Sequence, residues 1–240
     1  MTRIVEAELL DELPVDDPRA IHSRRDLRRI NALMGNARIM ARILKNFHDS
    51  RSLKTVVEIG AGDGSFALRL AEGLAPSEHR VEVLLVDRQN LLSYQTAARF
   101  QKLGWNAQPI QMDVFDWLAQ SSNSKFDLIV ANLFLHHFEE ARLRSLLEQA
   151  SKRTLLFLAC EPPRSVGALI VTRVLGLIGC NSVTRHDAVI SVRAGFRDQE
   201  LSSLWPKAES WQLLERPAGL FSHCFCARRA VAAAQTSWPR

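Results

Sequence analysis

Residues 56–64 decide the fold of this chain, and they read Val-Val-Glu-Ile-Gly-Ala-Gly-Asp-Gly. A short β-branched run, residues 55–59, leads into the glycines, and helical spacing of apolar residues begins at Ser65. Glycines at a strand-to-helix turn permit unusual backbone angles and let a ligand approach the main chain closely. The first turn of the helix that follows offers free N–H groups. This stretch therefore predicts a ligand-binding turn at the end of a strand.

Strand-like and helix-like segments alternate on both sides of this turn. The predicted strands are residues 55–59, 81–86, 109–112, 126–131 and 154–160, and the predicted helices are residues 65–74, 91–103 and 139–150. Such alternation indicates βαβ units and a mainly parallel, doubly wound sheet. The ligand crevice of a doubly wound sheet lies at the carboxyl ends of its strands.

The segments outside this alternation predict a helical extension and a helical insert. Residues 1–20 are acidic and contain prolines, which favours irregular structure. Residues 21–47 carry one apolar stripe at three- and four-residue steps, and this predicts a single amphipathic helix. A basic helix of this kind can lie on a membrane, but we expect it to pack on its own domain.

After residue 160 no strand is predicted for a long stretch. Helices are expected at residues 169–178, 184–194 and 199–204, with Gly195 ending the second and Asp198 capping the third. Residues 211–215 and 220–227 then predict two closing strands, in an antiparallel hairpin. We divide the chain into a helical extension (1–50), a main domain (51–229) with a helical cap insert at about 163–206, and a frayed tail (230–240).

The bulk properties exclude several classes of protein. The net charge of +5 and the pI near 9.3 are modest, and the basic residues are scattered among acidic ones, unlike those of a nucleic-acid-binding stripe. None of the four cysteines forms a C-x-x-C pair, so we expect reduced thiols and no metal site. The first residues do not resemble a signal peptide, and no apolar run is long enough to span a bilayer. We therefore expect a cytoplasmic protein without a membrane or nucleic-acid partner.

The spacing of the glycines separates this turn from that of dinucleotide-binding enzymes. Their fingerprint is G-x-G-x-x-G, whereas here the third glycine comes one residue early and Ser65 stands in its place. The sequence has a single tyrosine, Tyr94, and no Tyr-x-x-x-Lys pair. Both observations disfavour a NAD-dependent oxidoreductase.

The segment E-x-G-x-G-x-G, which begins at Glu58, resembles motif I of the class I S-adenosylmethionine-dependent methyltransferases. The resemblance covers residues 53–160 and implies a seven-stranded sheet with one antiparallel strand near the edge. It implies S-adenosyl-L-methionine as the cofactor, with Gly60, Ala61, Gly62 and Gly64 along its methionine and ribose portions. Glu58 would support the loop from below.

Residues that follow the next three strands match further positions of this family. Asp87, with Arg88 beside it, ends the second strand, where a carboxylate can accept hydrogen bonds from both ribose hydroxyls. The resemblance implies that Asp113 accepts a hydrogen bond from the adenine amino group and that Val114 packs on the ring. It places Asn132, after the fourth strand, near the methionine moiety and the transferred methyl group.

Three histidines are candidates for a general base, which a hydroxyl acceptor would need. His136 and His137 follow the fourth strand, beside the expected methyl position. In a helix their side chains would diverge by about 100°, so we expect only one to face the pocket. His186 lies in the predicted insert and is the second candidate. Histidines next to the cofactor can also be plain wall residues.

The substrate class rests on a looser resemblance. Residues 186–201 look similar to small bacterial methyltransferases that act on aromatic or polyketide-like metabolites. We therefore predict an O-methyltransferase for a small molecule of secondary metabolism, in which the N-terminal helix and the insert form the acceptor side. The apolar insert suits an acceptor pocket or a homodimer face. The alternatives are N- or C-methylation of a metabolite, methylation of protein or nucleic acid, and a binding protein without turnover.

Overall fold

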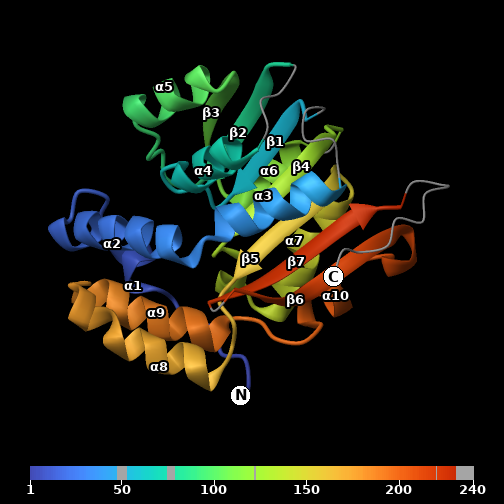
Figure 1. Cartoon of the computed structure of the whole chain (residues 1–240). Helices are drawn as coiled ribbons and strands as arrows, with labels where there is room; N and C mark the ends of the chain where they lie inside the picture. The colour runs from blue at the N-terminus through green and yellow to red at the C-terminus, as the bar shows by residue number, and fades with distance from the viewer. Residues whose placement is uncertain (48–52, 75–78, 122, 220, 231–240) are drawn as a thin grey trace.

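The computed structural model describes residues 1–47, 53–74, 79–121, 123–219 and 221–230. Its centre is a seven-stranded sheet with the strand order β3-β2-β1-β4-β5-β7-β6 (Figure 1). The strands are β1 (Thr55–Ile59), β2 (Val81–Asp87), β3 (Trp105–Gln111), β4 (Phe126–Asn132), β5 (Thr154–Glu161), β6 (Trp211–Ala218) and β7 (Ser222–Arg229). Strand β7 runs antiparallel to both of its neighbours, and the other pairings are parallel. The predicted seven-stranded fold is confirmed, including the antiparallel strand next to the edge.

The two edge strands differ most from the prediction. Strand β3 begins at Trp105, four residues before the predicted start, because this buried indole anchors a segment with few apolar residues. Each edge strand contains a proline, Pro109 in β3 and Pro217 in β6. Prolines are tolerated at sheet edges, where the missing N–H group need not remove a hydrogen bond between strands. The hairpin of β6 and β7 is confirmed, although residue 220 lies outside the described ranges.

Helices cover both faces of the sheet. One face carries α3 (Asn36–Phe47), α4 (Ser65–Gly73) and α5 (Tyr94–Lys102), and the other carries α6 (Val114–Gln120), α7 (Glu140–Ser151) and α10 (Glu200–Leu204). Alternate residues of a strand therefore enter different cores, as Val56 and Val57 do. Cys160, Cys224 and Cys226 lie in the core between the sheet and helices α3, α4 and α5, as expected for small apolar side chains. Helix α6 was not predicted.

A separate layer of helices lies beyond the carboxyl ends of the parallel strands (Figure 1). It consists of α1 (Leu9–Glu12), α2 (Pro18–Met34), α8 (Val166–Val174) and α9 (Ser182–Ala194). The short 3-10 turns η2 (Leu135–His137) and η3 (Leu175–Ile178) adjoin this layer, whereas η4 (Ala208–Ser210) precedes β6 at the other end of the sheet. Helices α2 and α9 are joined by the buried carboxylate of Asp26, which accepts hydrogen bonds from the Asn181 N–H at 2.9 Å and the Thr184 hydroxyl. The N-terminal helices thus pack on their own domain, as expected.

The prediction of one continuous helix over residues 21–47 is wrong. Gly35 has a left-handed conformation, with φ of 71°, and its N–H closes the end of α2 on the Asn31 carbonyl. A glycine carries no steric cost in this conformation, so the chain can turn there. Helix α3 stays on the sheet, where Met40 and Leu44 are buried, while α2 leaves it to join α9.

The predicted caps of the insert are half correct. Gly195 does end α9, in an extended conformation. Asp198 does not cap α10, whose first turn donates instead to the buried carboxylate of Glu215, from Leu201 N–H at 3.0 Å and Ser202 N–H at 2.7 Å. The sequence gives no local sign of this cap, because Glu215 lies on β6. None of the helices in the described ranges combines the length and the apolar character needed to cross a lipid bilayer.

Candidate active site

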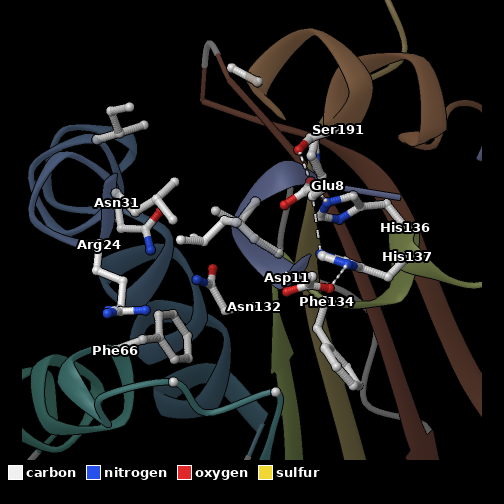
Figure 2. A pocket seen from close by; sticks show the side chains of 18 of the residues that line it. Glu8, Asp11, Arg24, Asn31, Phe66, Asn132, Phe134, His136, His137 and Ser191 are labelled. Atoms are coloured by element: carbon white, nitrogen blue, oxygen red, sulfur yellow. Dashed lines mark hydrogen bonds and ion pairs between the residues drawn. The ribbon is translucent and has the colours of Figure 1, made fainter. Parts of the chain in front are cut away.

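A cavity of about 880 Å³ opens between the carboxyl ends of the parallel strands and the helical layer. Figure 2 shows the glycine turn below it, Asn132 in the middle, Asn31 and Arg24 of α2 on one side, and His136 and His137 on the other. The predicted cofactor residues that line the cavity are Glu58, Gly60, Ala61, Gly62, Asp87, Arg88, Asp113, Val114 and Asn132. Residues from the first twelve of the chain, from α2, from α8, from α9 and from the turn after β4 form most of the remaining wall.

Gly64 is the one predicted cofactor residue that is not among those lining the cavity. A Cβ added to it would lie 2.8 Å from the Cδ1 atom of Leu85. Gly64 also has a φ of 72°. A side chain at this position would therefore collide with the sheet, and the glycine lets α4 start close to β2.

Gly60 is the glycine at which close approach matters most. Its φ is 70°, and a Cβ would lie 2.2 Å from Cδ2 of Phe134. The N–H groups of Gly60 and Ala61 both donate to the Val86 carbonyl, at 2.9 and 3.2 Å. The turn is thus fastened across the ends of β1 and β2, and it lies against the aromatic ring that follows β4.

Two strand-end carboxylates have hydrogen bonds within the chain. One oxygen of Asp87 accepts from Gly62 N–H and the other from Gln89 N–H, both at 2.9 Å. Asp113 caps helix α6 by accepting from Phe115 N–H at 2.8 Å. A carboxylate has about four acceptor positions, so Asp87 retains capacity for hydroxyl donors of a ligand.

Glu58 lies beneath the glycine turn. Its carboxyl group is buried and accepts a hydrogen bond from Ala67 N–H, in the first turn of α4, at 3.2 Å. Burial raises the pKa of Glu58 well above its usual value, the Ala67 hydrogen bond opposes the rise, and the negative charges of Asp63 and Asp87 add to it. The residue therefore ties β1 to the start of α4.

Asn132 is fixed by a buried chain of polar groups that the sequence did not reveal. The Asn36 amide donates to the Asn132 side-chain oxygen at 2.7 Å, and the Ser222 hydroxyl donates to the Asn36 side-chain oxygen. Asn36 begins α3 and Ser222 begins β7, so distant segments meet at this position. A satisfied buried network of this kind holds a side chain in one orientation.

His136 is held between two carboxylates and is 3% exposed. Its Nδ1 atom lies 2.7 Å from Glu161, and its Nε2 atom lies 3.3 Å from Glu8. Glu161 also accepts hydrogen bonds from the N–H groups of Phe134 and Leu135, at 3.1 and 2.9 Å. The buried carboxylate at the end of β5 therefore orients the whole turn after β4.

The charges of this cluster stabilise one another. Burial alone would lower the pKa of His136, but the hydrogen bonds to Glu161 and Glu8 raise it to about 9. Burial alone would raise the pKa of Glu8, but the hydrogen bond with His136 and the nearby His137 lower it to about 2. At neutral pH a cationic His136 thus faces anionic Glu8, and it has no free ring nitrogen with which to accept a proton.

The other two candidate histidines differ in position. His137 lines the cavity, with Nε2 3.9 Å from Glu8 and Nδ1 3.5 Å from Asp11. His186 is half-exposed, pairs with Asp187 at 3.1 Å and is not among the described residues that line the cavity. The structure thus brings His136 and His137 together at the cavity and leaves His186 outside it.

The first twelve residues form a strap across the cavity, which we call the N-terminal strap (residues 1–12). The Arg3 guanidinium donates to the Ala194 and Phe138 carbonyls, at 2.7 and 2.9 Å. The N–H groups of Leu9 and Leu10 donate to the carboxylate of Asp187, at 2.9 and 3.0 Å. These contacts carry Glu8 into the site, and sequence reasoning missed it because its partners lie more than a hundred residues away.

Comparisons with known proteins give a family for the middle of the chain. Residues 57–155 match the family described as "Methyltransferase domain". No curated protein matches the chain. The plantazolicin methyltransferase BpumL, solved in complex with SAH, is 14% identical and has a TM-score of 0.62, with 90% of this chain and 92% of that chain covered.

Two further solved structures are similar over nearly the whole chain. The N,N-8-amino-8-demethyl-D-riboflavin dimethyltransferase RosA from Streptomyces davawensis is 17% identical, with a TM-score of 0.59 and coverage of 93% of this chain and 62% of that chain. An O-methyltransferase family protein from Burkholderia thailandensis is 14% identical, with a TM-score of 0.58 and coverage of 91% and 62%. At these identities the structures are evidence of a shared fold, and the chain spans about three fifths of the length of these last two.

Proposed function

We propose that this chain, a class I S-adenosylmethionine-dependent methyltransferase, transfers the methyl group to a hydroxyl of a small, largely apolar metabolite of aromatic or polyketide-like type. Its membership of that family rests on the matched domain, residues 57–155, and on the strand order of its sheet. The proposal about the acceptor rests on one observation, namely that a single cavity of about 880 Å³ joins the glycine turn to a wall of helices.

The cofactor half of the cavity is assigned to the residues after β1, β2 and β3. Gly60, Ala61 and Gly62 would hold the methionine and ribose portions, and Asp87 the ribose hydroxyls. Asp113 and Val114 would hold the adenine. The carboxylate of Asp87 accepts a hydrogen bond from Gly62 N–H and therefore already lies beside the glycine turn. It would need no rearrangement to face a ribose there.

The acceptor half is assigned to the N-terminal strap, α2 and the insert. The side chains that line it are largely apolar, including Ile30, Val171 and Leu175. In the described part of the chain, the side-chain oxygen of Asn31 is buried in this wall without a hydrogen-bond partner. A buried orphan acceptor is costly unless a ligand supplies a donor. An apolar metabolite with at least one hydroxyl or N–H group fits this wall.

The donor supplies a methyl group already activated on a sulfonium, so the chain has to align the reactants and exclude water. Asn132, fixed by Asn36, stands between the two halves of the cavity. The cluster of Glu8, His136 and His137 lies on the acceptor side, and we assign to it the handling of the hydroxyl proton. His136 is not proposed as a free base, since both of its ring nitrogens have carboxylate partners.

The reaction is tested with S-adenosylmethionine that carries a labelled methyl group and with matched acceptors that differ in one atom. Naphthols and the corresponding naphthylamines are suitable pairs, with the products separated and identified by mass spectrometry. We expect label on the oxygen of the naphthol series. Label on nitrogen alone would overturn the proposal of O-methylation and leave the family unchanged.

The assignment of Asp87 is tested by thermal unfolding with S-adenosylhomocysteine. Ligand at 100 times its dissociation constant should stabilise the wild type by about 2.7 kcal/mol. We expect Asp87→Ala to lose this stabilisation. Asp116→Ala is the control, because that carboxylate is exposed on α6 and does not line the cavity. Equal responses of the two variants would contradict the ribose assignment.

A further inference from the structure

Three potential metal ligands converge on the acceptor side of the cavity. A carboxylate oxygen of Glu8 and one ring nitrogen each of His136 and His137 all lie within 4.8 Å of one another. The Glu8 oxygen is 3.3 Å from Nε2 of His136 and 3.9 Å from Nε2 of His137. Figure 2 shows the three side chains pointing toward one another beside the cavity.

Each of these histidines also has a carboxylate at its other ring nitrogen. Nδ1 of His136 lies 2.7 Å from Glu161, and Nδ1 of His137 lies 3.5 Å from Asp11. A metal-binding histidine nearly always donates its second ring N–H to a carboxylate, carbonyl or water, because this fixes the tautomer and makes the ligand more basic. Both imidazoles therefore turn Nε2 toward Glu8 and Nδ1 toward a supporting acceptor.

We propose that Glu8, His136 and His137 form a binding site for a divalent metal ion of the zinc type. Two imidazole nitrogens and one carboxylate oxygen are a ligand set that catalytic zinc sites use, with further positions left open. Imidazole ligands favour zinc over magnesium or calcium, which prefer oxygen. Zinc–ligand bonds of about 2.0–2.2 Å place tetrahedral ligands about 3.4 Å apart, so the site needs only a small closure around the ion. The ion would replace the His136 proton that faces Glu8, and its binding should therefore release a proton.

The expectation of no metal site rested on the cysteines, and it overlooked this ligand set. Glu8 is separated from His136 by 128 residues. Only the N-terminal strap, fastened by Arg3 and Asp187, brings the carboxylate to the histidines. A metal ion would thus link the strap directly to the turn after β4.

The use of the ion in catalysis rests on the proposed function. A metal with open positions facing the cavity would bind the acceptor oxygen and lower the pKa of its hydroxyl. This is how the cluster would handle the hydroxyl proton, which would be lost to solvent as the acceptor binds. The oxygen then forms a bond to the methyl carbon while the carbon–sulfur bond breaks, which yields the methyl ether and neutral S-adenosylhomocysteine. No free histidine base is needed in this scheme.

Metal binding is tested on the full chain without a histidine tag, after treatment with a chelator. Zinc is added in competition with a chromophoric chelator, and the metal content is measured by mass spectrometry. We expect one zinc ion per chain for the wild type and at least a tenfold loss of affinity for His137→Ala. His186→Ala is the matched control, since that histidine is half-exposed, does not line the cavity and is not one of the three converging ligands. Absence of zinc uptake by the folded wild type, or equal affinities of the two variants, would overturn the proposal.

Two further measurements separate the parts of the inference. Asp11→Asn removes the partly exposed carboxylate that supports His137, and loss of such support typically lowers metal affinity about 10–100-fold.

Cobalt in place of zinc gives a visible spectrum, which acetohydroxamate should shift if coordination positions are open. An unchanged spectrum would refute the acceptor-binding role. Binding of S-adenosylhomocysteine, measured on the same samples, shows whether the proposed function fails separately from the metal site.

Discussion

The two walls of the cavity are built in different ways. The cofactor wall consists of turns after successive strands, and its residues lie close to one another in sequence, as Gly60, Gly62 and Asp87 do. The acceptor wall consists of the N-terminal strap and the insert, and its polar contacts join Glu8 and Asp187 to segments far along the chain. The residues of the cofactor wall can be found from local sequence, whereas those of the acceptor wall come together only in the folded chain.

This difference implies that damage to one wall need not damage the other. The cofactor wall is part of the sheet and shares its core. The acceptor wall is held by a few hydrogen bonds and ion pairs, such as those of Asp187 and Arg3. Substitutions in the two walls should therefore separate binding of the cofactor from binding of the acceptor.

The largest effect is expected at the cofactor wall, from Gly60→Ala. The added Cβ would collide with the Phe134 ring, and the left-handed backbone costs a non-glycine residue about 1–2 kcal/mol in addition. We expect no stabilisation by S-adenosylhomocysteine in thermal unfolding. Gly104→Ala is the control, because Gly104 has a φ of 77° with no atom within 4 Å of an added Cβ. If both variants respond to the ligand like the wild type, close approach at Gly60 is unimportant for binding.

A smaller effect is expected at the acceptor wall, from Asp187→Ala. The N–H groups of Leu9 and Leu10 lose their charged acceptor, at a cost of about 1–3 kcal/mol. We expect faster cleavage of the strap by a glutamate-specific protease, followed by mass spectrometry, while stabilisation by S-adenosylhomocysteine persists. Glu148→Ala, which removes an exposed ion pair with Lys152, should change neither property. Loss of the cofactor response in Asp187→Ala would show that the two walls are coupled.

The smallest difference between the two walls is expected from the pH dependence of Glu58, which changes the stability of the whole chain. Its pKa is raised in the folded chain, so the folded state keeps a proton that the unfolded state loses above about pH 4.3. The free energy of unfolding should then fall with rising pH, by up to about 1.4 kcal/mol per pH unit, until the folded carboxyl ionises. Glu58→Gln should lack this slope in denaturant titrations of the ligand-free chain. Parallel pH profiles for the two proteins would mean that Glu58 is ionised when folded.

The sheet could be predicted because its signals are local. Strand β1 has the predicted bounds, and β2, β4 and β5 each extend one residue beyond theirs. These strands are buried, apolar runs that end at glycine or at a polar residue. Helix α6 escaped prediction because seven residues give too few turns for a helical period to show, and its start depends on the Asp113 cap. The break at Gly35 was missed because the apolar stripe continues across it.

The candidate site could be predicted only in part. The residues after the strands could be found because the topology places strand ends together, although their roles stay predictions. Glu161 directly follows the predicted strand 154–160, and nothing local indicates that it is the buried acceptor that orients His136. The strap was expected to be irregular and was given no role. Nothing in the sequence around Glu8 indicates that a carboxylate from the start of the chain joins two histidines beyond β4.

The prolines at both borders of the sheet have a consequence for association between copies of the chain. Pro109 and Pro217 each remove one N–H group from an outermost strand. A further strand that docked alongside would lack a donor at that point, which is one of the ways in which native proteins block edge-to-edge aggregation. Extension of the seven-stranded sheet by a strand of another copy is therefore disfavoured at both edges.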